Sequence, residues 1–80
     1  MTAPDADLEL DCRAMLCPLP VIELAKRYPE VPVGGVIAVA SDDVAARTDV
    51  PAWCRMRGHE YVGEAAADDG VPRYLVRRLS

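Results

Sequence analysis

Five consecutive apolar residues, Val36-Ile37-Ala38-Val39-Ala40, set the architecture available to this chain. The run has the length of a β-strand, and turn residues bound it, Gly34-Gly35 before and Ser41-Asp42-Asp43 after. A strand without polar positions belongs in the middle of a sheet, covered by a helix on at least one face. Because the chain has only 80 residues, we expect one small domain around this strand.

The flanking segments predict two more kinds of element. Residues 8–11 alternate between leucine and acidic residues, which is typical of a strand with one buried face. From Pro18 to Tyr28, apolar residues recur at spacings of three and four, which predicts an amphipathic helix. A second helix is expected from the cap residues 41–43 through Arg57, divided by Pro51.

The C-terminal part predicts an antiparallel hairpin. Two strand patterns, His59 to Ala65 and Arg73 to Leu79, are separated by the turn residues Asp68-Asp69-Gly70. The order is therefore βαβαββ. A chain this short cannot cover both faces of a sheet, so we predict an α/β fold, a two-layer sandwich with two helices packed on one face of a four-stranded mixed sheet. We assign residues 8–80 to this domain and the polar residues 1–7 to a disordered N-terminal tail.

The first strand leads into a cysteine followed by two prolines, Cys17-Pro18-Leu19-Pro20. Proline has no N–H and a helical φ, so Pro18 and Pro20 suit the first and third helical positions, with Cys17 as the N-cap. A thiolate there faces the positive end of the helix dipole and any free N–H groups of the first turn, which lowers the pKa of the thiol. We expect it at the rim of the domain, within reach of a second protein. The alternative is an inert, buried cysteine.

The other cysteines have simpler interpretations. Cys12 ends a strand and Cys54 shares a helical face with Trp53, so we expect both in the core. A zinc site from the three cysteines and His59 has suitable ligand types, but the ligand spacings do not fit a closed structural site. We expect no metal and interpret His59 as a strand-edge residue.

Charge and composition limit the classes of partner. Thirteen acidic and nine basic residues give a net charge of −4, which argues against direct binding to nucleic acid. No apolar run approaches the ~20 residues of a membrane helix. Three cysteines, with no basic segment followed by an apolar leader, argue against a secreted disulfide framework. We expect a cytoplasmic protein, and nothing in the sequence requires more than a monomer.

Several motifs occur in a characteristic order over about residues 8–79. They are Leu10-Asp11, Cys17-Pro18-Leu19-Pro20-Val21, Asp42-Asp43, Asp49-Val50-Pro51, Trp53-Cys54, Gly58-His59-Glu60 and Arg73-Tyr74-Leu75-Val76. In this order the chain resembles the TusA/SirA family of small sulfur-carrier proteins. The resemblance implies the same two-layer βαβαββ sandwich.

The resemblance also implies a persulfide relay, with Cys17 as the catalytic thiol and Pro18 and Pro20 as its supporting motif. A cysteine desulfurase would donate sulfur to Cys17, and a downstream sulfur-relay or tRNA-thiolation protein would accept it. The sulfur would serve tRNA 2-thiouridine synthesis, molybdenum cofactor or related sulfur metabolism. It is held covalently, so no cofactor is implied. Such a relay component is a sulfurtransferase without being a classical turnover enzyme.

Two positions depart from the family pattern. Ala14 stands where the family usually has glycine, so a turn with positive φ there would be strained. Cys12 replaces a small residue such as alanine, and a second thiol there could attack a Cys17 persulfide and leave a disulfide. The alternative function is therefore a thiol redox or regulatory module that uses Cys17 with Cys12 or a partner's cysteine. A third is an interaction domain with an inert Cys17. Expected partner contacts around Cys17 are Arg13, Lys26 and Arg55.

Overall fold

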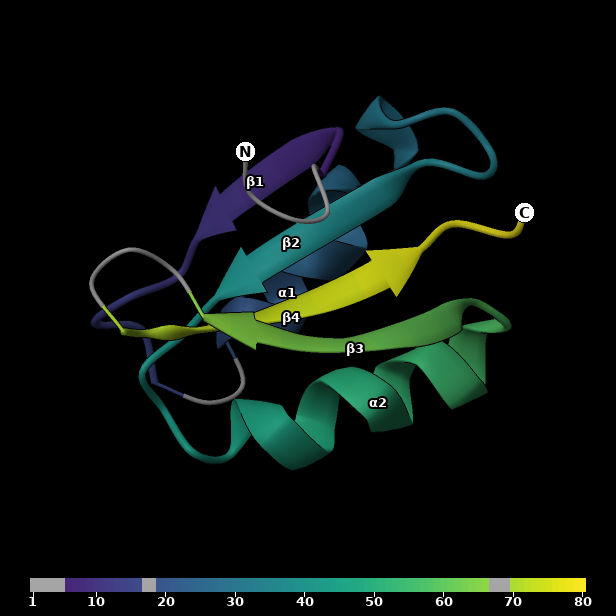
Figure 1. The fold of residues 1–80 in the computed structure, drawn as a ribbon. Helices are drawn as coiled ribbons and strands as arrows, with labels where there is room; N and C mark the ends of the chain where they lie inside the picture. The colour runs from purple at the N-terminus through teal and green to yellow at the C-terminus, as the bar shows by residue number, and fades with distance from the viewer. Residues whose placement is uncertain (1–5, 17–18, 67–69) are drawn as a thin grey trace.

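The computed structural model describes residues 6–16, 19–66 and 70–80. The predicted βαβαββ order is confirmed (Figure 1). The strands β1 and β2, and the hairpin strands β3 and β4, differ from the predicted bounds by two residues or fewer at each end. The elements are β1 (Leu8–Asp11), α1 (Leu19–Arg27), the short 3₁₀ helix η1 (Tyr28–Glu30), β2 (Val36–Ala40), α2 (Ala46–Arg57), β3 (Glu60–Ala66) and β4 (Pro72–Arg77).

The four strands form one mixed sheet in the order β1-β2-β4-β3. β1 runs parallel to β2, with Leu8 opposite Ile37 and Asp11 opposite Ala40. β4 is antiparallel to both β2 and β3, which confirms the predicted hairpin. The apolar run 36–40 is a central strand, as its sequence predicts.

The core lies between the two helices and one face of the sheet, as expected for a two-layer sandwich (Figure 1). Alternate strand positions supply the sheet side of the core, because successive side chains of a strand point to opposite faces. Both helices contribute to the same cluster. Its members include Leu10, Ile37, Val39, Tyr74 and Val76 from the sheet, Leu24 from α1, and Val50, Trp53 and Cys54 from α2.

Ion pairs cross the opposite face of the sheet. Glu9 of β1 pairs with Arg73 of β4, across β2, and Glu60 of β3 pairs with Arg77 of β4 at 3.1 Å. In the strand register, Ala38 lies directly beside Glu9, and it is fully buried. Long charged side chains can shield apolar surface with their stems, so this face needs no helix to cover it.

Helix α2 differs from the prediction at Pro51. The predicted division of the helix there is wrong, since α2 is continuous from Ala46 to Arg57 with Pro51 inside it. A proline removes one intrahelical hydrogen bond, but the buried side chains of Val50 and Trp53 on either side hold the helix against the sheet.

The cap expected from residues 41–43 is not found, because α2 begins at Ala46 with Ala45 as its N-cap and has no side-chain cap bond. Asp43 instead stabilises the turn just before the helix. Its Oδ1 accepts the N–H of Ala45 at 3.0 Å, and its carbonyl accepts the N–H of Ala46 at 3.0 Å. Gly58, with φ of +77°, ends the helix as predicted, because a glycine adopts the left-handed conformation without a Cβ penalty.

The segment expected as a tail begins outside the described residues, which exclude 1–5. Asp7, in contrast, is tied to β2: its N–H donates to the carbonyl of Val36 at 2.7 Å, and its carboxylate accepts the Val36 N–H at 2.9 Å. A disordered tail stays a prediction for residues 1–5. The expected turn residues Asp68 and Asp69 also lie outside the described residues.

Candidate functional site

The candidate site lies at the edge of the sheet where β1 and β2 end (Figure 1). Because these strands are parallel neighbours, the segments that leave them, residues 12–16 and 41–45, start side by side. The first of these segments leads through Cys17 to α1. Cys17 and Pro18 lie outside the described residues, so the site is defined by the residues around them.

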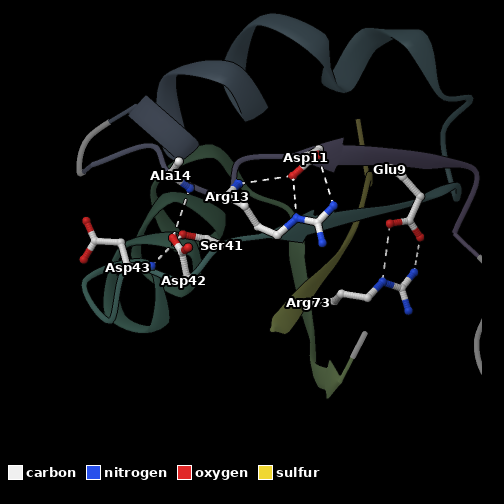
Figure 2. Close-up of polar contacts among 8 residues, drawn as sticks. All are labelled: Glu9, Asp11, Arg13, Ala14, Ser41, Asp42, Asp43 and Arg73. Carbon is white, nitrogen blue, oxygen red and sulfur yellow. Dashed lines mark hydrogen bonds and ion pairs between the residues drawn. The ribbon is translucent and has the colours of Figure 1, made fainter. Parts of the chain in front are cut away.

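Hydrogen bonds anchor the loop of residues 12–16. The N–H of Cys12 donates to the carbonyl of Ala40 at 2.8 Å, and the N–H of Met15 donates back to the carbonyl of Cys12 at 3.2 Å. Between them, the N–H of Ala14 donates to Oδ1 of Asp42 at 3.2 Å (Figure 2). The end of β2 and the segment after it therefore hold the loop that leads to Cys17.

Ala14 has a φ of +65°, in the left-handed region. For an alanine this conformation costs about 1–2 kcal/mol relative to the right-handed one, because the Cβ approaches the following carbonyl oxygen. From the sequence, strain at Ala14 is expected only if its φ is positive, and in the structure it is positive. The loop before Cys17 is therefore strained.

Arg13 lies on this loop and is paired locally. Its Nε and Nη2 donate to the Asp11 carboxylate at 2.9 and 3.1 Å, in the bidentate arrangement visible in Figure 2. The hydrogen bonds from Arg13 lower the pKa of Asp11. Arg13 thus lies on the loop that leads to Cys17, with part of its charge balanced by Asp11, and its contact with a partner stays a prediction.

The start of α1 offers fewer backbone donors than the sequence suggests. Pro20 lies in α1 and is buried, and a proline has no N–H. The N–H of Leu19 donates to the carbonyl of Leu16 at 2.8 Å, so it is not free to face an anion. The predicted N-cap role of Cys17 and helical position of Pro18 fall outside the described residues.

Exposed apolar side chains surround the entry to α1. Leu16, Leu19 and Ile22, here called the apolar rim, are 73%, 49% and 48% exposed. Leu19 and Ile22 are three positions apart on α1, so they share one face of the helix. Adjacent exposed apolar side chains are typical of a surface that contacts another protein.

Both cysteines in the described part of the chain, Cys12 and Cys54, are buried. Cys12 has an exposed fraction of 0% and Cys54 of 1%, as the sequence predicts. Burial raises the pKa of Cys12, and the charges of Glu23 and Asp11 act in the same direction. Burial also raises the pKa of Cys54 to about 11. Both side chains remain thiols at neutral pH, and a thiol is a much weaker nucleophile than a thiolate.

The structure places the other two predicted contact residues toward the opposite edge of the sheet. Both helices start at the edge that holds residues 12–16 and run away from it (Figure 1). Lys26 lies in the last turn of α1, 3.9 Å from the carboxylate of Glu23, and Arg55 lies exposed in the last turn of α2. Neither lies beside Arg13.

His59 also lies at the opposite edge, where it packs in an aromatic cluster. Its ring stacks on the ring of Trp53, with 5.2 Å between the ring centroids, and its centroid lies 4.9 Å from that of the Tyr28 ring. Its Nδ1 accepts the N–H of Leu79 at 3.1 Å. Burial lowers the pKa of His59, and the cations Arg57 and Arg78 add to the effect, so the imidazole is neutral at pH 7.

Two kinds of feature are absent from residues 6–16, 19–66 and 70–80. These residues contain no group of three histidine, cysteine or acidic side chains placed to hold a metal ion. Within the same ranges, no helix has the length and apolar character needed to cross a membrane.

A small cavity of about 40 Å³ lies beside the candidate site, lined by residues 41–44, Arg47, Pro72 and Tyr74. This volume holds a few water molecules, whereas small-molecule sites usually measure about 300–1,000 Å³. The cavity therefore does not provide a substrate pocket.

Comparison with known proteins identifies the family. The family model described as Sulfurtransferase TusA matches residues 8–78, nearly the whole chain. The chain belongs to the TusA family. The resemblance noted from the motifs is therefore confirmed.

Individual relatives of the TusA family cover most of the chain. The chain is 38% identical over 74 residues to "Sulfur carrier protein TusA" of Pseudomonas syringae pv. syringae (strain B728a), which covers 92% of this chain and 87% of that one. It is 36% identical over 69 residues to a "Putative sulfur carrier protein" of Archaeoglobus fulgidus, covering 86% and 90% of the two chains. A crystal structure of a SirA-like protein from Desulfitobacterium hafniense superposes with a TM-score of 0.76 at 24% identity over 91% of this chain and 99% of that one, which shows the shared fold.

Sequence reasoning missed two parts of this TusA-family site. Asp42 is interpreted from sequence as a helix cap, whereas its carboxylate holds the N–H of Ala14, 28 residues away. No local pattern points to a bond over that separation. The apolar rim is also missed, although the spacing of Leu19 and Ile22 on one face of a helix is a signal that could have found it.

Proposed function

We propose that this protein is a sulfur carrier, which accepts sulfane sulfur on Cys17 and passes it to a second protein. The observation that carries the proposal is the burial of the other two thiols. Cys12 and Cys54 are both inaccessible and have raised pKa values, so chemistry between this protein and a partner falls to Cys17. The names of the relatives, which describe sulfur carriers, support the same function.

The proposed transfer is a thiol exchange. The Cys17 thiolate attacks the terminal sulfur of a persulfide on the donor protein, and the sulfur–sulfur bond of that persulfide breaks. The bonding electrons leave with the donor cysteine as a thiolate, while Cys17 becomes the persulfide. A thiolate of the acceptor repeats the step on Cys17. No net oxidation or reduction occurs, so the transfer needs no cofactor.

The partners follow from this chemistry. A cysteine desulfurase is the proposed donor, since it forms a persulfide from cysteine, and the proposed acceptor is a downstream protein of tRNA thiolation, molybdenum cofactor or related sulfur metabolism. The apolar rim supplies a surface on which such proteins can dock near Cys17. The setting we propose is the cytoplasm, with the carrier as a monomer.

The alternative redox module has less support within this chain. Its intramolecular form requires Cys12 to attack as a thiolate, and the burial and raised pKa of Cys12 oppose that step. A disulfide with a partner's cysteine would still need only Cys17.

The test is intact mass and peptide mapping after the reduced protein is incubated with a cysteine desulfurase and cysteine. We expect a gain of one sulfur atom on Cys17 that a reductant removes, and no gain in a Cys17→Ala control. Cys17 joined to Cys12 or to the desulfurase, without a persulfide, would favour the redox module instead.

A further inference from the structure

The two neighbouring carboxylates after β2, Asp42 and Asp43, accept hydrogen bonds from different segments. Asp43 accepts the N–H of Ala45 and so stabilises the turn before α2. Asp42 accepts the N–H of Ala14 and so serves the loop that leads to Cys17 (Figure 2). Figure 2 shows the Ala14 bond reaching across from one segment to the other, at the edge where β1 and β2 end.

Ala14 depends on such a partner because its own backbone conformation is unfavourable. At a φ of +65°, an alanine has a preference for returning to the right-handed or extended region. A hydrogen bond from the Ala14 N–H to the side-chain oxygen of Asp42 opposes that return.

The consequence reaches Cys17 through the chain. The bond from the Cys12 N–H to Ala40 fixes the start of the loop, so a change of φ at Ala14 alters the direction in which the chain leaves for Leu16 and the residue after it. Loss of the Asp42 bond is therefore expected to change the direction of the chain at Leu16, the last described residue before Cys17.

We propose that Asp42 is a positioning residue for Cys17, whose carboxylate keeps Ala14 in the left-handed conformation and so sets the loop from which the chain reaches the thiol. The inference rests on the proposed sulfur-carrier function and adds to it a residue on which transfer depends. It also makes the need for Asp42 specific to an alanine at position 14, because glycine adopts positive φ freely.

Three substitutions separate this role from a simple charge effect. Asp42→Ala removes the acceptor and the charge, Asp42→Asn removes the charge and keeps an acceptor oxygen, and Ala14→Gly removes the backbone strain. Asp43→Asn is the matched control, since it removes the same charge one residue away and keeps an acceptor for Ala45.

The first readout is the rate at which a cysteine desulfurase with cysteine loads sulfur on Cys17. We expect Asp42→Ala to slow loading about fivefold, the effect of one hydrogen bond on the population of the competent loop. Asp42→Asn and Asp43→Asn should stay within about twofold of the wild type. Adding Ala14→Gly to Asp42→Ala should restore the rate to within about twofold of Ala14→Gly alone.

The second readout is the pH profile of Cys17 alkylation by iodoacetamide, followed by peptide mass. We expect Asp42→Ala to change the pH profile of Cys17 alkylation and Asp42→Asn to leave it unchanged. Adding Ala14→Gly to Asp42→Ala should restore the wild-type profile. A pure charge effect would instead shift the profile to lower pH equally in both Asp42 variants, since a nearby negative charge disfavours the thiolate. This readout needs no sulfur donor, so it tests Asp42 even if the wild-type protein fails to load sulfur and the proposed function falls.

The proposal is overturned if Asp42→Asn behaves like Asp42→Ala, or if Ala14→Gly gives no rescue. If Asp42→Ala does not fold while the double variant does, the rescue itself supports the proposal. If neither folds, Asp42 is needed for the whole domain and the proposal is wrong.

Discussion

Ala14 shows how one backbone angle can decide the geometry of a functional loop. The Cβ of Ala14 strains this turn, since a φ of +65° suits glycine. The sequence can raise this question, because alanine is unusual in a turn of this kind. Only the structure gives the sign of φ, which depends on where β1 and β2 end relative to each other.

Ala14→Gly is expected to stabilise the protein. The substitution removes a left-handed penalty of about 1–2 kcal/mol and adds a smaller cost for the greater freedom of glycine in the unfolded chain, which leaves a gain of about 0.5–1 kcal/mol. Urea denaturation should show a higher midpoint with an unchanged slope. The matched control is Ala52→Gly within α2, where the same change should destabilise by about 1 kcal/mol. A loss of stability in Ala14→Gly would show that the loop is not strained.

The burial of Cys12 and Cys54 can be predicted from the sequence more easily than the conformation of Ala14. Cys12 follows an alternating strand and Cys54 lies on the apolar face of a helix, so both local patterns place them in the core, where the structure has them. Their pKa shifts could not be assigned from pattern alone, because the charges that raise the pKa of Cys12 include Glu23, which reaches it from α1.

The elements were predictable wherever the signal is local. The apolar run of β2 and the hairpin of β3 and β4 follow from their own residues. Pro51 is the exception: its local preference favours a break in α2, but the burial of Val50 and Trp53 on both sides of it keeps the helix continuous. Here tertiary packing outweighs propensity.

Helix direction decides which exposed residues can meet a partner at Cys17. Both helices run away from the edge that holds residues 12–16, so the last turns that carry Lys26 and Arg55 are far from it, and the first turn of α1 is near. A sequence-based choice of contact residues by charge alone overlooks this direction. The apolar rim is therefore a better candidate for docking than these two cations.

Ile22→Glu is expected to slow transfer of sulfur between the desulfurase and this protein. An apolar contact at the centre of an interface is worth about 1–2 kcal/mol, which corresponds to a fivefold or larger loss in the second-order loading rate. Stability should change by less than about 1 kcal/mol, because Ile22 is 48% exposed.

Val33→Glu is the matched control for the apolar rim. Val33 is 62% exposed and lies in the turn before β2, at the opposite edge of the sheet. The same substitution there should leave the loading rate unchanged. Equal effects of the two substitutions would remove the apolar rim as the docking surface.

At the scale of the whole molecule, the candidate site and the aromatic cluster lie at opposite edges of the sheet. One edge of the sheet carries the strained loop and the apolar rim, while the other edge carries the aromatic cluster of Tyr28, Trp53 and His59. The cluster joins η1, which carries Tyr28, to α2, which carries Trp53, and to His59 just before β3. His59 also accepts the N–H of Leu79 near the C-terminus. We therefore expect changes at His59 to act on stability and to leave the loop before Cys17 intact.

We expect His59 to make the stability of the protein depend on pH. Its pKa is lowered from the ordinary value of 6.5 in the folded state, mainly by burial, so the unfolded chain binds the proton more readily. The stability is fully present above pH 6.5 and declines as the pH falls below it, until the folded-state pKa is reached. One proton limits the slope to about 1.4 kcal/mol per pH unit. The carboxylates with lowered pKa values, Asp11 and Glu30, act only at more acidic pH.

The measurement is urea denaturation of the wild type and a His59→Gln variant between pH 5 and 8. We expect the wild type to lose stability between pH 6.5 and 5, while His59→Gln, which has no group to protonate there, stays level over that interval although less stable at pH 7.5. His59 is the only histidine in the chain, so the difference in slope belongs to this residue. Parallel pH profiles would show that the cluster accommodates the charged imidazole as well as the neutral one, which its burial between two aromatic rings and beside two arginines argues against.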